Sequence, residues 1–246
     1  AAGWWYYFPT AYLLKEPLAF LVMIVISLFV AIQSIRKLHE RSIGAILEWM
    51  RDNFFLVVSL LFIGVYWLQS MRSPLNIGVR HVLPAYPFIY LLVSREITRW
   101  LKFYSLTEPA NFGGWLYAIY ERYIKSLPRY FIFSLLFLWM VLSVIAAFPN
   151  YLSYYNELAG GSNNGYKYIV DSNYDWGQDL KRLNDFVFKN NIESIAVDYF
   201  GGGSPQYYFK DKFKPWWSAR GKPDPSAGDP EWLAISATIR QGTLGR

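Results

Sequence analysis

The stretch Leu18–Ile35, LAFLVMIVISLFVAIQSI, decides the fold class of this chain. It carries no charged residue, and as a helix it is long enough to cross about 30 Å of hydrocarbon. Two further apolar blocks, at 54–71 and 130–148, have the same character. Each of these three blocks therefore predicts a transmembrane helix.

A fourth apolar block, at 77–94, is weaker. It contains Arg80, His81 and two prolines, and its uncharged part begins only at Val82. A charge is expensive within a membrane, so Arg80 and His81 should lie near one end of this span. Counting this block, we predict an α-helical membrane protein with four transmembrane helices.

Composition supports this class and excludes several others. The chain has 246 residues, of which 54% are hydrophobic and 20% aromatic, with no cysteine and two histidines. Disulfides, thiolate metal sites and a cysteine nucleophile are therefore excluded, and a histidine-rich metal site is disfavoured. The net charge is +6. Because the basic residues cluster beside the apolar blocks, we attribute them to membrane topology and not to nucleic-acid binding.

The basic loops predict the orientation. Segments 36–53 and 95–129 hold most of the inter-span lysines and arginines, whereas the link after the second span holds Arg72. The positive-inside rule places the two basic segments in the cytoplasm. Residues 1–16, the Arg80–His81 end of the third span and everything after Pro149 are then extracytoplasmic. Within the second basic segment, the periodicity of 115–125 predicts a helix lying in the membrane interface.

Composition changes after the fourth span, so we divide the chain into a transmembrane region, 1–149, and an extracytoplasmic domain, 150–246. Strand, helix and strand patterns alternate in the second part and predict a small α/β domain. The predicted elements are a short strand at 168–171, a helix at 177–189, and strands at 194–200 and 232–238. Asp171 and Asn173 would then stand at the carboxyl end of a strand, where ligands bind in parallel sheets. We expect this domain, and the chain as a whole, to be a fragment of a longer protein.

The polar stretch Val170–Leu183, VDSNYDWGQDLKRL, is the main candidate site in this domain. Asp175 followed by Gln178 is the pattern of a helix N-cap with a reciprocal glutamine, and apolar residues 180, 183, 186 and 187 share a helix face. The D-x-N-x-D start resembles a calcium loop, but Trp176 replaces the turn glycine and Arg182 the bidentate glutamate. A divalent cation, a ligand-facing role and a domain-docking role stay open. The residues concerned are Asp171, Asn173, Asp175, Trp176, Gln178 and Asp179.

Three basic residues are candidates for contact with a phosphate. Arg80 is either an arginine that extends to the interface or a cation held for a phosphate, which its planar fork can bind with two hydrogen bonds. His81 is a packing residue or a second polar contact, and Lys15 is an interfacial lysine or a phosphate ligand. We find no Ser-His-Asp arrangement and no phosphate loop in the sequence.

Several motifs resemble one enzyme family. They are LLKEP before the first span, NIGVRHVLPAYPF in the third, FPNYLSYYNELAGGSNNGYKYIVDSNYDWGQDLKRL after the fourth, and WLAISAT near the end. Together they resemble the C-terminal half of membrane glycosyltransferases of the type C fold, similar to the protein O-mannosyltransferases and the lipid A aminoarabinose transferase.

The resemblance implies a plasma-membrane enzyme that takes a sugar from a polyprenyl-phosphate carrier and transfers it to an acceptor protein or glycolipid outside the cytoplasm. It also implies a catalytic carboxylate in a loop upstream of residue 1, so no aspartate here is assigned that role. Arg80 matches the family's arginine near the carrier phosphate, and Lys15 lies in the matching LKEP context. The alternative that the residues leave open is a non-catalytic transport or assembly subunit with an outward sensor domain.

Overall fold

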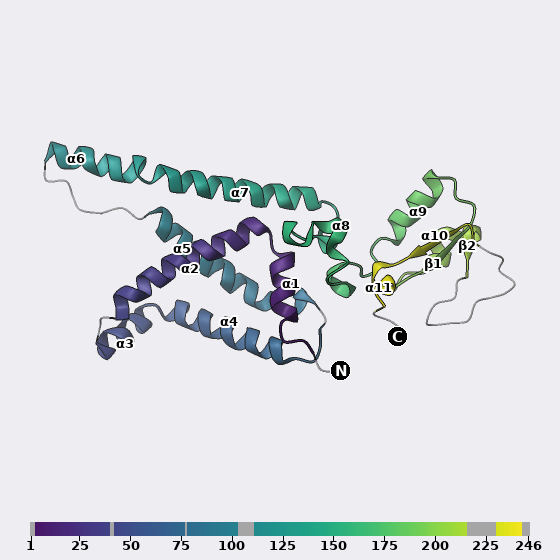
Figure 1. Ribbon diagram of the computed structural model, residues 1–246, viewed down its shortest axis with the longest axis horizontal. Coiled ribbons are helices and arrows are strands. Elements are labelled where there is room, and N and C mark those ends of the chain that lie inside the picture. The colour runs from purple at the N-terminus through teal and green to yellow at the C-terminus, as the bar shows by residue number, and fades with distance from the viewer. Residues whose placement is uncertain (1–2, 40–41, 77, 103–110, 216–229, 243–246) are drawn as a thin grey trace. The chain divides into compact units, whose positions relative to one another are not determined.

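The computed structural model describes residues 3–39, 42–76, 78–102, 111–215 and 230–242. The chain forms two compact units, Ala1–Phe148 and Pro149–Arg246 (Figure 1). The first unit is helical, and the second combines short helices with a small sheet.

The first unit consists of helices. Its α-helices are α1 (Tyr7–Lys15), α2 (Leu18–His39), α3 (Ile43–Asp52), α4 (Phe54–Arg72), α5 (Tyr86–Leu101), α6 (Phe112–Ile119) and α7 (Leu127–Ala147). Between α4 and α5 lie two 3₁₀ turns, η1 (Val79–His81) and η2 (Leu83–Ala85), and the π-helical turn η3 (Tyr120–Ile124) follows α6.

The packed core of this unit lies where α2 meets α5 and α7. Its buried side chains are Ala19, Phe20, Met23, Val93, Ile97 and Leu136. Figure 1 shows α2 beside α5, and the Ser27 hydroxyl donates a hydrogen bond to the Val93 carbonyl (3.3 Å) between them. The small residue Ala19 is fully buried, which allows the helices to approach closely as in membrane bundles.

Outside this core, the long helices expose apolar side chains. Val25 on α2 is 65% exposed, Leu61 on α4 62% and Phe131 on α7 64%. A helix that is apolar on its exposed faces needs a hydrocarbon solvent. Among the described residues, three helices are long and apolar enough to cross a membrane, within Leu18–Arg36, Phe54–Arg72 and Phe112–Ala147. The protein is therefore a mostly helical chain with three candidate membrane spans.

The predicted span at 77–94 differs from the observed helix at both ends. Residues 79–85 form the turns η1 and η2, and α5 begins at Tyr86, with Pro87 in its first turn. Proline lacks the N–H that a helix interior needs but suits the first turn, so the two prolines place the helix start here. The helix then continues past Ser94 to Leu101. It therefore includes three charged side chains, of Arg95, Glu96 and Arg99, that the prediction had left in a loop.

The segment 115–125 is helical, as its periodicity predicts, but it is not a separate helix. It comprises α6 and η3, which lead directly into α7, so that 112–147 forms one long candidate span (Figure 1). The helix α7 itself agrees with the predicted span at 130–148.

The second unit contains a three-stranded parallel sheet. Its strands are β1 (Ile195–Asp198), β2 (Phe213–Lys214) and β3 (Trp232–Ile235), with β1 in the centre. Ile195 pairs with Phe213 on one side and Trp232 on the other. The helical segments are η4 (Tyr151–Ser153), η5 (Glu157–Ala159), α8 (Ser162–Gly165), η6 (Asp171–Asn173), α9 (Leu180–Lys189), α10 (Pro205–Phe209), η7 (Lys210–Lys212) and α11 (Ala237–Arg240).

A small core joins α9 to the sheet. Leu180 and Val187 of α9 are buried with Ile195 of β1 and Phe209 of α10. Phe186, which the helical pattern placed on the same face, is 48% exposed and lies outside this core.

Two predictions for this unit are corrected, and one strand was not predicted. The segment 168–171 is not a strand: Asp171 has φ +58° and begins η6, and the Ile169 carbonyl accepts the Tyr155 hydroxyl (2.5 Å) instead of a strand partner. The last predicted strand stops at Ile235 and is followed by α11. The edge strand β2 was not predicted, because it is only two residues long.

Candidate functional sites

The stretch 170–183 folds into a compact loop before α9. The Asp175 Oδ1 accepts a hydrogen bond from the Gly177 N–H (3.0 Å), and the Gln178 Oε1 accepts one from the Trp176 N–H (2.8 Å). The predicted N-cap is therefore wrong. Asp175 and Gln178 close a turn, and α9 begins later, at Leu180, with Asp179 in the N-cap position.

Asp175 also binds the end of the described chain. Its Oδ2 accepts the Ala237 N–H at the start of α11 (3.0 Å), and its carbonyl accepts the Thr238 hydroxyl (3.1 Å). The same hydroxyl oxygen accepts the Asp171 N–H (3.2 Å). Asn173 is 2% exposed and donates to the Val170 carbonyl (3.2 Å). The polar groups of this loop thus connect it to α11, which gives Asp175 and Asn173 a structural role.

The other three candidates are more exposed. Trp176 is 48% exposed and packs edge-on against Phe200, with ring centroids 5.4 Å apart. The Gln178 Nε2 donates to the Asp179 Oδ2 (3.1 Å), and Asp179 forms an ion pair with Arg182 (2.7 Å) whose side chains are about half exposed.

A cavity of about 290 Å³ lies beside this loop, where β1 and β3 end. Parallel strands present such a site at their carboxyl edge, because the connecting segments leave a crevice there. Carboxylates and tyrosines line it, from Tyr174, Asp175, Asp179, Asp198 and Tyr199. Burial raises the pKa of the Tyr174 hydroxyl, and the nearby Tyr166, Asp179 and Asp175 add to this effect.

Asp198 and Tyr199 were not predicted as site residues. Both lie at the end of the strand pattern SIAVDYF, and this position could have identified them. The predicted residues Asp171 and Asn173 instead follow no strand. The Tyr199 hydroxyl donates to the Gly177 carbonyl (2.7 Å) and so connects the sheet edge to the loop. Within the described residues, no group of three or more histidine, aspartate or glutamate side chains is placed to hold a metal ion.

In the first unit, Arg80 and His81 lie on the turn η1. The His81 carbonyl accepts the Tyr66 hydroxyl of α4 (2.9 Å), and the His81 ring lies 5.9 Å from the ring of Phe8 on α1. These contacts hold the backbone of the turn while the Arg80 side chain remains exposed. His81 therefore serves in packing, and Arg80 is the accessible cation.

Lys15 lies near the other end of α1. It is seven residues beyond Phe8, which corresponds to about 10 Å along a helix axis. Burial lowers the pKa of the Lys15 ammonium to about 7. The structure thus joins His81 to the start of α1 and places Lys15 at its last turn.

Glu16, which follows Lys15, is a buried acid that the sequence interpretation did not single out. It is 4% exposed, and its Oε2 accepts the Tyr90 hydroxyl (3.3 Å). Burial raises the pKa of the Glu16 carboxyl, and the hydrogen bond from Tyr90 acts in the opposite direction. Glu16 belongs to the LKEP motif, from which the sequence analysis selected Lys15 as the candidate residue.

No protein-family profile matches the chain, and neither a curated protein nor a solved structure shows detectable similarity to it.

Proposed function

We propose that this chain is part of an integral-membrane glycosyltransferase of the plasma membrane. It would move a sugar from a polyprenyl-phosphate carrier to an extracytoplasmic protein or glycolipid, with the second unit outside the cytoplasm. The resemblance of the LKEP, VRHVLP and NELAGG motifs supports this function, as do the three apolar helices that suit a membrane enzyme.

The observation that carries the proposal is the exposed guanidinium of Arg80 on a turn whose backbone is held by Tyr66. The turn η1 is followed by η2 and then by α5, so under this proposal the cation would lie near the end of an apolar helix, where a lipid phosphate would bind. When the bond from the sugar to the carrier breaks, negative charge grows on the leaving phosphate. A fixed guanidinium stabilises this charge more in the transition state than in the ground state.

Lys15 would contribute a second cation at the last turn of α1. Burial lowers the pKa of its ammonium to about 7, and a carrier phosphate beside it would favour the charged form and raise this pKa. The catalytic carboxylate is assigned to no residue of this chain.

Sugar transfer by the full-length protein tests the role of Arg80. Turnover with a polyprenyl-phosphate sugar should fall about 100-fold or more in Arg80→Ala, as when one preorganised donor to a developing anion is removed. Arg80→Lys keeps the charge but loses the fork, so an intermediate rate is expected. The matched control is Arg72→Ala, an exposed arginine at the end of α4. Equal turnover in Arg80→Ala and wild type would remove Arg80 from the mechanism.

A second candidate is a non-catalytic transport or assembly subunit with an outward sensor domain. The internal bonding of Asp175 favours it, because a carboxylate that accepts two backbone N–H groups stabilises a fold without chemistry. Under this alternative, the full-length protein would transfer no sugar from any polyprenyl-phosphate donor, and Asp175→Asn would change partner binding only through stability.

A further inference from the structure

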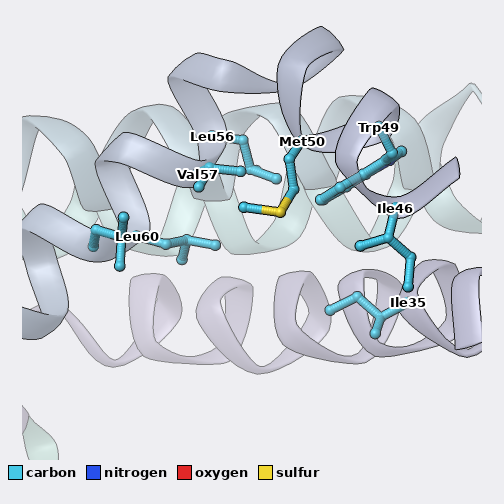
Figure 2. Close-up of a pocket in the computed structure, with 8 residues that line it drawn as sticks. Ile35, Ile46, Trp49, Met50, Leu56, Val57 and Leu60 are labelled. Atoms are coloured by element: carbon cyan, nitrogen blue, oxygen red, sulfur yellow. The ribbon is translucent and has the colours of Figure 1, made fainter. Parts of the chain in front are cut away.

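An apolar groove, which Arg80 does not line, runs between the helices of the first unit. It has a volume of about 380 Å³, and its walls come mainly from α2, α4 and α5. Ile35, Trp49, Leu56 and Leu60 also line a second groove, of about 430 Å³, that α3 covers in part. Figure 2 shows side chains of α3 and α4 projecting into the same space near Ile35 of α2. Both volumes lie in the range of about 300–1,000 Å³ that small-molecule sites have.

One part of the groove lining is charged. Arg95, Glu96 and Arg99 of α5 all line it, and among the residues that the structure describes they are its charged lining residues. The Glu96 side chain is 6% exposed and forms ion pairs with Arg95 (2.7 Å) and Arg99 (2.9 Å). Two guanidinium groups against one carboxylate leave a net charge of +1 in the lining.

Neighbouring helices hold these two guanidinium groups in place. Arg95 donates to the Asn53 side chain before α4 (2.8 Å), and Arg99 donates to the Ser34 hydroxyl of α2 (2.9 Å). The arginine side chains still keep 38% and 45% of their surface exposed. Each guanidinium has five N–H donors, so both can donate further hydrogen bonds to an anionic ligand.

We propose that this groove binds one anionic phospholipid of the bilayer. An acyl chain lies along the apolar walls, and the phosphate is held by Arg95 and Arg99. The charge complementarity and the apolar lining favour this occupant over a neutral lipid, because guanidinium binds phosphate through paired hydrogen bonds. The positive-inside rule predicts that this basic end of α5 faces the cytoplasm, the leaflet in which basic pockets between helices bind anionic head groups. The inference does not depend on the proposed sugar transfer.

Lipid titration of the delipidated full-length protein, followed by native mass spectrometry, tests the site. Wild type should bind one phosphatidylglycerol more tightly than phosphatidylcholine with the same chains. Arg99→Gln should weaken phosphatidylglycerol binding about fivefold to tenfold and remove part of the preference, whereas Arg99→Lys keeps the charge but loses the fork and should have an intermediate effect. The matched control is Arg51→Gln on α3, since Arg51 is 76% exposed and lies outside the groove.

A second variant keeps the test decisive if Arg99→Gln misfolds. Ala31 lines the apolar wall, so Ala31→Phe should occupy the path of the acyl chain and weaken both lipids without removing a charge. Equal binding of the two lipids by wild type, or equal effects of Arg99→Gln and Arg51→Gln, would overturn the proposal. A photo-reactive residue in place of Trp49 should label lipid; labelling of a second copy or of another helix would also overturn it.

Discussion

The substitution Asp175→Asn should weaken the contact between the 171–179 loop and α11. The Asp175 carboxylate accepts two backbone N–H groups, from Gly177 and Ala237, each at 3.0 Å. Asp175→Asn keeps the shape of the side chain but retains one acceptor oxygen, so its amide N–H₂ must face one of the two donors. The substitution therefore separates the hydrogen bonding of this side chain from its packing.

The expected loss follows from the number of bonds. A hydrogen bond to a charged group contributes about 1.5–3 kcal/mol, and one such bond is lost while the other becomes neutral. A local destabilisation of about 1.5–3 kcal/mol corresponds to a tenfold to hundredfold increase, roughly, in the open fraction. The control Asp179→Asn breaks a half-exposed ion pair with Arg182, which contributes about 0.2–1 kcal/mol.

Hydrogen exchange of the full-length protein measures this difference directly. The Ala237 amide should lose about tenfold to hundredfold protection in Asp175→Asn, and less than about fivefold in Asp179→Asn. If both variants change Ala237 protection equally, or if Asp175→Asn leaves it unchanged, Asp175 does not connect the loop to α11. Its ligand-facing interpretation would then regain priority.

Three further predictions concern Lys15 and Gly165. Burial lowers the pKa of Lys15 to about 7, so carrier binding through its ammonium should weaken as the pH rises above that value. In Lys15→Arg the affinity should not change with pH, because the guanidinium stays charged. If a binding titration gives the same pH dependence for both proteins, this contact is excluded. Burial of this ammonium disfavours the folded state at low pH, so the stability of the fold should increase as the pH rises from 7 to 10.5, because the unfolded chain binds the extra proton over that range. Thermal unfolding at several pH values measures this increase. Gly165→Ala should destabilise the second unit by about 1–3 kcal/mol, because the new Cβ would lie 2.1 Å from the buried ring of Tyr155. The control is Gly202→Ala, whose new Cβ meets no described atom within 4 Å. Its free energy of unfolding, measured by thermal unfolding, should stay within about 0.5 kcal/mol of wild type. A comparable loss in both variants would contradict the packing explanation.

Long apolar runs were sufficient to predict the membrane helices. Leu18–Ile35 and 54–71 are helical in the structure because a helix alone satisfies every backbone group in hydrocarbon, whatever lies around it. Gly160 and Gly161 both have positive φ, a backbone conformation that glycine adopts at little cost. These features depend on local composition.

The start of α5 and the role of Asp175 could not be predicted from local sequence patterns. Two prolines in an apolar run can either bend a helix or begin one, and in the structure Pro84 and Pro87 lie in the first turns of η2 and α5. Asp175 matched a capping pattern with Gln178, but its second carboxylate oxygen found Ala237, distant in sequence, and the loop closed differently.

The sequence by itself determined that the chain has apolar membrane helices followed by a polar unit of mixed structure, because composition and period are local properties. The tertiary structure alone decided which polar groups meet. It brought Arg95, Glu96 and Arg99 into an apolar groove and assembled Asp198, Tyr199 and Asp175 at the edge of a parallel sheet. Such sites depend on which segments pack together. These segments are far apart in the sequence, so no local sequence pattern predicts that they meet.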